Sequence, residues 1–409
     1  MTDPLVLREC IAVDARGDRD DAVDIVIRSG RIAEIVSAGG ARLDGDAREL
    51  DVRGKTVVPG LVNMHEHLSN AHPGTTEERS IADEDETGRA LRMAGNALKA
   101  LRAGVTSMRL VGEKDATDVR VRDALEAGKI IGPRVWTAGA ALDYVGGHGG
   151  TTGALEGEGP EEFGRLARGQ VDAGVDLLKL MICDGGAGQH LETVRFSPDE
   201  YGAIRGVARS ANLKMSLHTA AVPDPIMEQV IEDGVDSLEH CYLVGEDLLK
   251  RLIASNILLV MTPLVGRSPD YFETIGLPAD MIQRLTVAGQ THWKAITLAV
   301  EKGARLALGT DFHSHLEFGG TWAPVRELEV YEEAGADAKT TLAIASRNGA
   351  EWLGCGDELG LVEEGFIADL LVLDHNPLSA GASAFRDLRL VIARGSVFEP
   401  RPAERPGTV

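Results

Sequence analysis

The sequence predicts an α/β protein: a (β/α)8 TIM barrel with a small β-sandwich module formed from both termini. Three observations predict it. Short strand-like runs occupy both ends of the chain, strand-like and helix-like patterns alternate between them, and 409 residues are enough for a barrel with an attached module. We therefore expect residues 59–349 to form the barrel and residues 1–58 and 350–409 to form the composite sandwich.

The two ends of the chain share one pattern. Near the N-terminus, "AVDIVIRSGRIAEIVSAGG" alternates apolar and polar residues, and "RSGR" is typical of a turn between two strands. The same pattern returns near the C-terminus in "ADLLVLDHNP" and "LRLVIARGSVFEP". Strands from both ends are therefore expected to form one module.

The middle of the chain repeats a junction between a helix and a strand. Each junction has a helix end, a glycine suited to a left-handed cap, and then a run of apolar residues. The junctions are "LRAGVTSMRL", "VDAGVDLLKL", "IEDGVDSLEH" and "VEKGARLALGTD". The runs "VVPGLVNMHEH", "GPRVWTAGA", "LKMSLHTA" and "NILLVMTP" bring the predicted parallel strands to eight, the number that a barrel of this size needs.

The composition excludes several classes of function. The formal net charge of −22 argues against a nucleic-acid partner, and no run of residues is long and apolar enough to cross a membrane. The four cysteines are far apart and suggest neither a disulfide framework nor a thiolate zinc site. We expect a cytoplasmic protein that forms a homo-oligomer and takes a small molecule as its partner.

The predicted strands end on residues that can bind metal ions. In a barrel of this type the catalytic groups lie at the C-terminal ends of the strands. A single histidine there is more often a hydrogen-bonded core residue, and a His-x-His pair alone has roughly even odds of binding a metal. Six candidates at five strand ends favour a metal site: His65, His67, Lys179, His218, His240 and Asp311.

Lys179 has an unusual setting for a lysine. It lies in "VDLLKLMICDGG", a strand that is expected to be buried, where an unpaired ammonium is costly. Imidazole and carboxylate ligands suit zinc, and two such ions need a bridging anion between them. A lysine that has reacted with CO2 becomes a carbamate, which has the charge and the two oxygens of a carboxylate. Burial favours that reaction because it makes the amine neutral.

These motifs resemble those of the metal-dependent hydrolases of the amidohydrolase superfamily, in the imidazolonepropionase-like and prolidase-like branch. The likeness extends over essentially the full length of the chain. It rests on motifs that occur in the order used by that branch: "VVPGLVNMHEHL", "GVTSMRLVG", "GPRVWTAGAAL", "GGHGG", "LLKLMICDGG", "SLHTA", "SLEH", "LGTD" and "LGLVEEGFIADLLVLD".

The resemblance implies two divalent metal ions, most plausibly zinc. It assigns His65, His67 and Asp311 to one ion and His218 and His240 to the other, with carboxylated Lys179 between them. It also implies an attacking hydroxide that bridges the ions and a proton shuttle at Asp311. The middle residue of "His-Glu-His" departs from the apolar residue that is more usual there, without a consequence for ligation.

Further residues match positions that contact the substrate in relatives. They are His148 in "YVGGHGG", which a turn alone could also explain, together with Tyr144 and Arg109. Arg109 could bind a substrate carboxylate or brace the barrel. His313 and His315 lie near Asp311 in the sequence and are candidates for supporting it.

The resemblance also discriminates among activities. Mononuclear deaminases have a Glu three residues after the histidine of the fifth strand, where this chain has Ala221, so deamination is disfavoured. Lys179 favours the binuclear relatives that cleave amides. The predicted activity is hydrolysis of an amide bond in a small molecule, an N-acyl amino acid or a dipeptide, including ochratoxin-like amides. The alternatives are hydrolysis of a cyclic amide such as an imidazolone or hydantoin and, from another class, a non-catalytic assembly scaffold.

Overall fold

The computed structural model describes residues 4–18, 21–42, 47–70, 84–147, 149–150, 153–183, 196–220 and 224–400. The chain divides into two compact units. The first comprises Met1–Asn63, Leu98–Ser107 and Ser314–Val409, and the second comprises Met64–Ala97 and Met108–His313. No helix among the described residues is both long enough and apolar enough to span a membrane.

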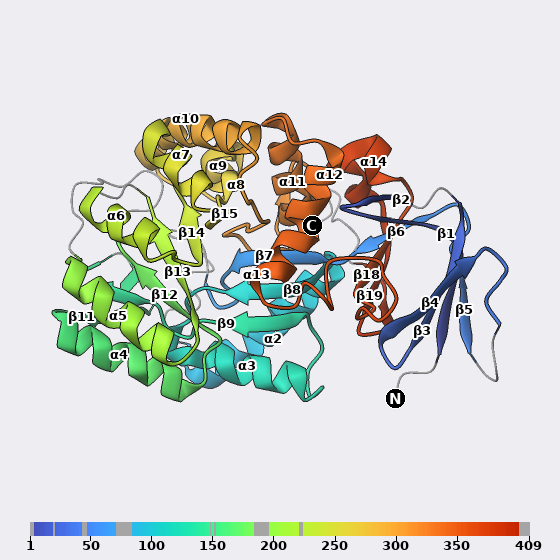
Figure 1. Cartoon of the computed structure of the whole chain (residues 1–409), viewed down its shortest axis with the longest axis horizontal. Helices are drawn as coiled ribbons and strands as arrows, with labels where there is room; N and C mark the ends of the chain where they lie inside the picture. Colours follow the sequence, from blue (N-terminus) through green and yellow to red (C-terminus); the bar gives the residue numbers. More distant parts are fainter. Residues whose placement is uncertain are drawn as a thin grey trace. The chain divides into compact units, whose positions relative to one another are not determined.

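The first unit contains a sheet built from both ends of the chain (Figure 1). Its order is β20-β19-β18-β6-β1-β3-β4, and β2 and β5 also pair with β1. The C-terminal strand β18 pairs antiparallel with β6, so that Leu370 lies opposite Pro59. The strands are β1 (Leu5–Asp14), β2 (Gly17–Asp18), β3 (Val23–Arg28), β4 (Arg31–Ser37), β5 (Arg48–Asp51), β6 (Thr56–Pro59), β18 (Leu370–Leu373), β19 (Leu388–Ala393) and β20 (Ser396–Phe398).

The local sequence explains this sheet. The predicted turn at "RSGR" joins β3 to β4, and its central residues, Ser29 and Gly30, have φ angles of 52° and 76°. Alternate apolar residues of the strands are buried together in one core, including Ile25, Ile27 and Leu370. Both termini thus contribute to one sheet, and its arrangement as a sandwich stays a prediction.

The first unit also contains the short strands and helices that precede the C-terminal strands. They are β16 (Glu317–Phe318), β17 (Thr321–Trp322), α11 (Ala323–Glu333), α12 (Ala338–Leu342), α13 (Asn348–Trp352) and α14 (Pro377–Ala380).

The second unit contains a parallel sheet of six strands in the order β11-β10-β12-β13-β14-β15. A further sheet has the order β7-β8-β9, and the first three residues of β7 and of β8 are assigned to the first unit. The strands are β7 (Leu61–Glu66), β8 (Val105–Leu110), β9 (Arg134–Thr137), β10 (Leu142–Tyr144), β11 (Leu155–Gly157), β12 (Leu177–Met181), β13 (Lys214–Thr219), β14 (Ser237–His240) and β15 (Leu258–Val260).

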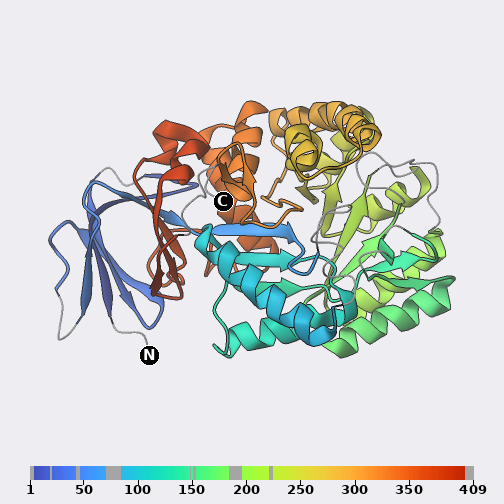
Figure 2. The same cartoon turned by 180° about the vertical axis from the view of Figure 1, so that it is seen from behind.

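Helices alternate with these strands, as the sequence predicts. Both views show α4 and α5 side by side along the sheet that contains β12 and β13 (Figures 1 and 2). The helices are α2 (Glu86–Arg102), α3 (Thr117–Glu126), α4 (Pro160–Ala173), α5 (Pro198–Ser210), α6 (Asp224–Glu232), α7 (Glu246–Ala254), α8 (Pro263–Arg267), α9 (Pro269–Thr274) and α10 (Ala279–Glu301).

Glycine ends the helices at the repeated junctions. The four predicted cap positions, Gly104, Gly174, Gly234 and Gly303, have φ angles of 94°, 86°, 61° and 65°. Only glycine adopts this left-handed conformation without steric cost, so the chain can turn sharply from helix to strand at each junction. The predicted alternation of helix and parallel strand is therefore confirmed.

Hydrogen bonds extend both sheets beyond the named strands. Met64 N donates to Leu308 O at 2.7 Å, and Leu259 N donates to Arg305 O at 2.9 Å, which places residues 305–308 beside β7 and β15. The described strands β7 to β15 nevertheless form two separate sheets, and no closed barrel is detected among the described residues. The α/β architecture is confirmed, while the closed (β/α)8 barrel stays a prediction.

Candidate metal centre

Most of the predicted ligands lie at or just after the C-terminal ends of strands in the second unit, whereas Lys179 is the middle residue of β12. His65 is the penultimate residue of β7, Lys179 lies in β12, His218 lies in β13 and His240 ends β14. Asp311 follows the segment that hydrogen bonds to β7, and its backbone N–H donates to His65 O at 2.9 Å. Parallel strands end on the same side of their sheet, so the fold gathers residues that are far apart in the sequence.

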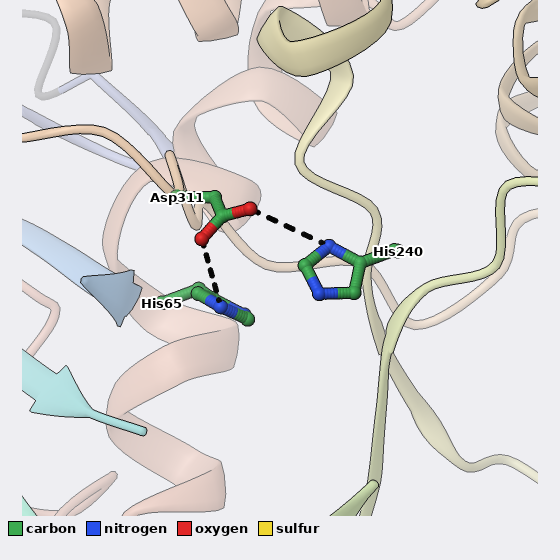
Figure 3. Close-up of side chains that lie close together, drawn as sticks. All are labelled: His65, His240 and Asp311. Atoms are coloured by element: carbon green, nitrogen blue, oxygen red, sulfur yellow. Dashed lines mark ion pairs between the residues drawn. The ribbon is translucent and has the colours of Figure 1, made fainter. Parts of the chain in front are cut away.

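Asp311 is the centre of the cluster. Its Oδ1 lies 3.2 Å from His65 Nε2 and 3.6 Å from His67 Nε2. Its Oδ2 lies 3.9 Å from His240 Nδ1, and Figure 3 shows the carboxylate between the rings of His65 and His240. The His65, His240 and Asp311 ligand atoms lie within 4.8 Å of one another, close enough to hold one ion.

The other histidines adjoin this group. The ring of His240 is centred 4.7 Å from that of His65 and 4.6 Å from that of His218. The His67 ring is centred 5.4 Å from that of His65, and its Nδ1 lies 2.8 Å from Gly112 O. The structure thus brings all four histidines into one cluster. The division of these ligands between two ions stays a prediction.

Lys179 is buried without a polar partner. Its side chain belongs to a strand whose residues are all buried, and Nζ has no hydrogen-bond partner among the described residues. Burial lowers the pKa of Lys179 to about 8, although the nearby charges of Glu239 and Asp311 oppose that shift. An amine of this kind is neutral in a large fraction of molecules near pH 8, and a neutral amine is a nucleophile.

The protonation states suit a cation. Burial lowers the pKa of His67 to about 4 and that of His240 well below its usual value, so both rings are neutral at pH 7. Burial by itself would raise the pKa of Asp311, but His65, His67 and Lys179 outweigh it and hold the pKa at about 2. Neutral imidazoles around an ionised carboxylate are the donor set that zinc prefers. The residues present therefore fit the predicted metal.

Two of the predicted ligands have unusual backbone conformations. His240 has a φ angle of 68° and Asp311 one of 56°, which are uncommon for residues other than glycine. The next residue, Cys241, is also left-handed at 58°, and its N–H donates to Thr219 O at 2.8 Å. The surrounding hydrogen bonds hold these conformations, which cost free energy and are typical of functional sites.

Sequence reasoning gave no role to Glu239, the residue before His240. Its carboxylate is fully buried and accepts hydrogen bonds from Arg109 Nη2 at 2.6 Å and from Ser216 Oγ at 2.7 Å. His65 Nδ1 lies 2.8 Å from the other oxygen. A charged residue in the predicted strand "SLEH" was the available signal, since a buried carboxylate needs a partner.

The remaining predicted residues include Arg109, Tyr144, His148, Ala221 and His313, and the structure describes three of these five. Arg109 is fully buried, and its contacts with Met64 O and Glu239 favour the bracing role over substrate binding. Tyr144 ends β10, with its ring centred 6.0 Å from that of Phe196. His148 and Ala221 lie outside the described residues, so their predicted roles stay predictions. His313 Nε2 lies 2.7 Å from Asn70 O.

Comparison with known proteins identifies the family. Residues 56–397 match the model of the amidohydrolase family. The chain belongs to this family. The prediction from the sequence motifs is confirmed, and the protein is a hydrolase of amide-type carbon–nitrogen bonds. Amidohydrolases are generally metal-dependent, in agreement with the cluster of His65, His240 and Asp311.

Individual relatives agree with this assignment. Over 349 residues the amidohydrolase is 27% identical to the ochratoxinase of Aspergillus niger, with 79% of this chain and 71% of the relative covered. A solved Xaa-Pro dipeptidase with bound methionine has a TM-score of 0.85 at 24% identity, with 97% of this chain and all of that chain covered. The putative prolidase from Bifidobacterium longum has a TM-score of 0.83 at 26% identity, with 98% and 96% covered.

Proposed function

We propose that this amidohydrolase uses two divalent metal ions, most plausibly zinc, to hydrolyse the amide bond of an N-acyl amino acid or a dipeptide. The observation that carries the proposal is the buried amine of Lys179, which has no hydrogen-bond partner among the described residues. A carbamate on this amine would supply the anion that two adjacent cations need between them.

The donor set supports the same conclusion. One ion would be held by His65, His67 and Asp311, the other by His218 and His240, with the Lys179 carbamate between them. When bound, such ions lower the pKa of a shared water and polarise the carbonyl of the substrate. Asp311 is ionised and lies among the histidines, so it can accept a proton from the attacking water and return it to the leaving nitrogen.

The relatives support the proposed substrate class. One relative is named an ochratoxinase, and a solved structure with the same fold is named a Xaa-Pro dipeptidase. A panel of N-acyl amino acids, dipeptides and cyclic amides, assayed with the zinc-loaded protein, tests this part of the proposal. Turnover of cyclic amides alone would contradict it and favour the imidazolone-type or hydantoin-type activity.

Replacement of Lys179 tests the metal site. We expect Lys179→Ala to lose metal and turnover, because the bridging anion is removed, and a short carboxylic acid to restore part of both. Metal content is measured by elemental analysis and turnover on the best substrate of the panel. Lys250→Ala, which removes an exposed lysine paired with Glu246, is the matched control and should keep both. Full metal content and activity in Lys179→Ala would contradict the proposal.

We also infer that the two sheets of the second unit close into one barrel. On one side, closure is supported by the hydrogen bonds from Met64 N to Leu308 O and from Leu259 N to Arg305 O. On the other side, the backbone N of Asp176, directly before β12, donates to the carbonyl oxygen of Thr137, the last residue of β9, at 2.8 Å. The C-terminal ends of all strands would then surround the metal site, which is the arrangement in which barrel enzymes place their catalytic groups.

A further inference from the structure

The two oxygens of the Glu239 carboxylate have different partners. Oε1 accepts three hydrogen bonds, from Arg109 Nη2 at 2.6 Å, Ser216 Oγ at 2.7 Å and Ser237 Oγ at 3.0 Å. Oε2 lies 2.8 Å from His65 Nδ1. Both side chains of this second contact are at most 2% exposed, so water does not compete for it. One oxygen is saturated with donors, and the other is directed at the imidazole.

This asymmetry determines which nitrogen of His65 carries a proton. The guanidinium of Arg109 forms a fully buried ion pair with this carboxylate, with Nη2 2.6 Å from Oε1, so the carboxylate carries its negative charge. An ionised carboxylate only accepts hydrogen bonds, so Nδ1 must be the donor. A neutral His65 then has its lone pair at Nε2, the atom that lies 3.2 Å from Asp311 Oδ1.

The lone pair of His65 therefore faces another acceptor. In the neutral Nδ1–H form of the ring, Nε2 of His65 carries no proton, so Nε2 and the carboxylate oxygen Oδ1 of Asp311 are two acceptors 3.2 Å apart. A cation between them would satisfy both atoms, which is the relation expected of two ligands of one ion.

Arg109 fixes the position of this pair. Its Nε donates to Met64 O at 2.6 Å, the carbonyl directly before His65, and its Nη1 donates to Ser237 Oγ at 2.8 Å. One guanidinium thus links the backbone of β7 to the side chains of β14. The distance between His65 and Glu239 is determined by this buried link as well as by their own hydrogen bond.

We propose that Glu239 is a positioning residue that holds His65 in the Nδ1–H tautomer and thereby presents the Nε2 lone pair to a divalent cation. The metal part of this inference rests on the proposed function, whereas the tautomer is a property of the protein alone. Carboxylates that accept a hydrogen bond from a ligating histidine generally raise metal affinity, and their loss lowers that affinity ~10–100-fold.

Glu239→Gln gives a test with a specific outcome. The three donors around the Oε1 position require an acceptor, so the amide oxygen of the glutamine takes that place. Its NH2 group then occupies the Oε2 position and donates to His65 Nδ1, which forces the proton to Nε2. We expect the tautomer of His65 to invert and the zinc affinity to fall by ~10–100-fold.

The tautomer is measured by NMR on the full-length protein with 15N-labelled histidine, before and after addition of zinc. The His65 signals are assigned from their absence in His65→Asn. Zinc affinity is measured in competition with a chelator. A control variant removes a partly buried ion pair of the first unit, Arg8→Gln with Asp24→Asn, whose charged atoms lie 2.7 Å apart. It should change neither the tautomer nor the zinc affinity.

Glu239→Gln leaves the Arg109 guanidinium without its counter-charge and can therefore fail to fold. In that case Arg109→Met with Glu239→Gln takes its place, because this pair of substitutions removes both charges together. The fraction of Nδ1–H tautomer should still fall, since His65 again faces an amide.

Two results would overturn the inference. One is an Nε2–H tautomer of His65 in the wild-type protein without zinc. The other is an unchanged Nδ1–H tautomer and zinc affinity in the folded Glu239 variant. Failure of the proposed function is distinguishable: a wild-type protein that binds no zinc would refute the metal site, while the tautomer measurement would still decide the role of Glu239.

Discussion

Two buried cations in the second unit have opposite surroundings. Arg109 donates hydrogen bonds to Met64 O, Ser237 and Glu239, whereas Nζ of Lys179 has no hydrogen-bond partner among the described residues. Arg109 belongs to a set of paired groups that we call the platform: Arg109, Ser216, Ser237 and Glu239. Lys179 belongs to a set that we call the rim: His65, His67, Lys179, His218, His240 and Asp311.

The difference distinguishes residues that stabilise the fold from residues that are available for reaction. A buried charge with all its hydrogen bonds made is held in place and resists change, because any displacement leaves a charge without a partner. A buried amine without such bonds has a lowered pKa and remains available for reaction. We therefore expect rim substitutions to reduce activity at nearly unchanged stability, and platform substitutions to reduce stability.

Asp311→Asn should have the largest effect on the rate. The amide cannot accept the proton from the attacking water, so turnover should fall by ~10²–10⁴-fold even when the metal site is full. Turnover is measured at metal occupancy verified by elemental analysis, together with the unfolding midpoint. Turnover near that of the wild type would exclude the shuttle role, and a large loss of stability would break the distinction between rim and platform.

Arg109→Met should have the largest effect on stability. It leaves the ionised Glu239 buried without its cation, which is expected to cost about 3–5 kcal/mol of the free energy of unfolding. Urea denaturation measures this loss. The variant that combines Arg109→Met with Glu239→Gln should be more stable than Arg109→Met alone, because it removes both charges. If Arg109→Met alone is as stable as the wild type, the platform does not stabilise the fold.

A third set of buried side chains consists of two carboxyls. Glu113 and Asp118 are both buried, and neither has an ion pair among the described residues. Burial, together with the charge of Asp118, raises the pKa of Glu113 to about 8, and burial raises that of Asp118 to about 7. Glu239 is equally buried, but its pKa is lowered, and the charge of Arg109 makes the largest contribution that opposes burial there.

This contrast predicts a smaller, pH-dependent effect. Because the folded state holds the proton of Glu113 more tightly than the unfolded state, its contribution is complete below about pH 4.5 and is lost as the pH rises through about 8. We expect the free energy of unfolding to fall by about 1.4 kcal/mol for each pH unit within this range. Urea denaturation at several pH values measures it, and Glu113→Gln should flatten the dependence. An equally steep dependence in Glu113→Gln would assign the effect to other groups.

Local sequence patterns determined most of the elements and the identity of the rim. The glycines of the repeated junctions adopt the predicted positive φ angles because that conformation depends on the residue itself. The rim could be predicted because side chains alternate along a strand and parallel strands end on one side of a sheet. Residue type and strand position placed His65 and His240 at strand ends, whereas Lys179 lies in the middle of β12 and Asp311 lies outside the named strands.

Only the tertiary structure decided how these residues are paired and charged. His65 and Glu239 are 174 positions apart, so no local pattern indicates that their side chains form a hydrogen bond. The sequence left two roles open for Arg109, and its contacts with Met64 and Glu239 favour the bracing role. The opposite pKa shifts of Glu239 and Glu113 also have no local cause. They arise because burial penalises every charge, and only the packed fold determines which charges receive a partner.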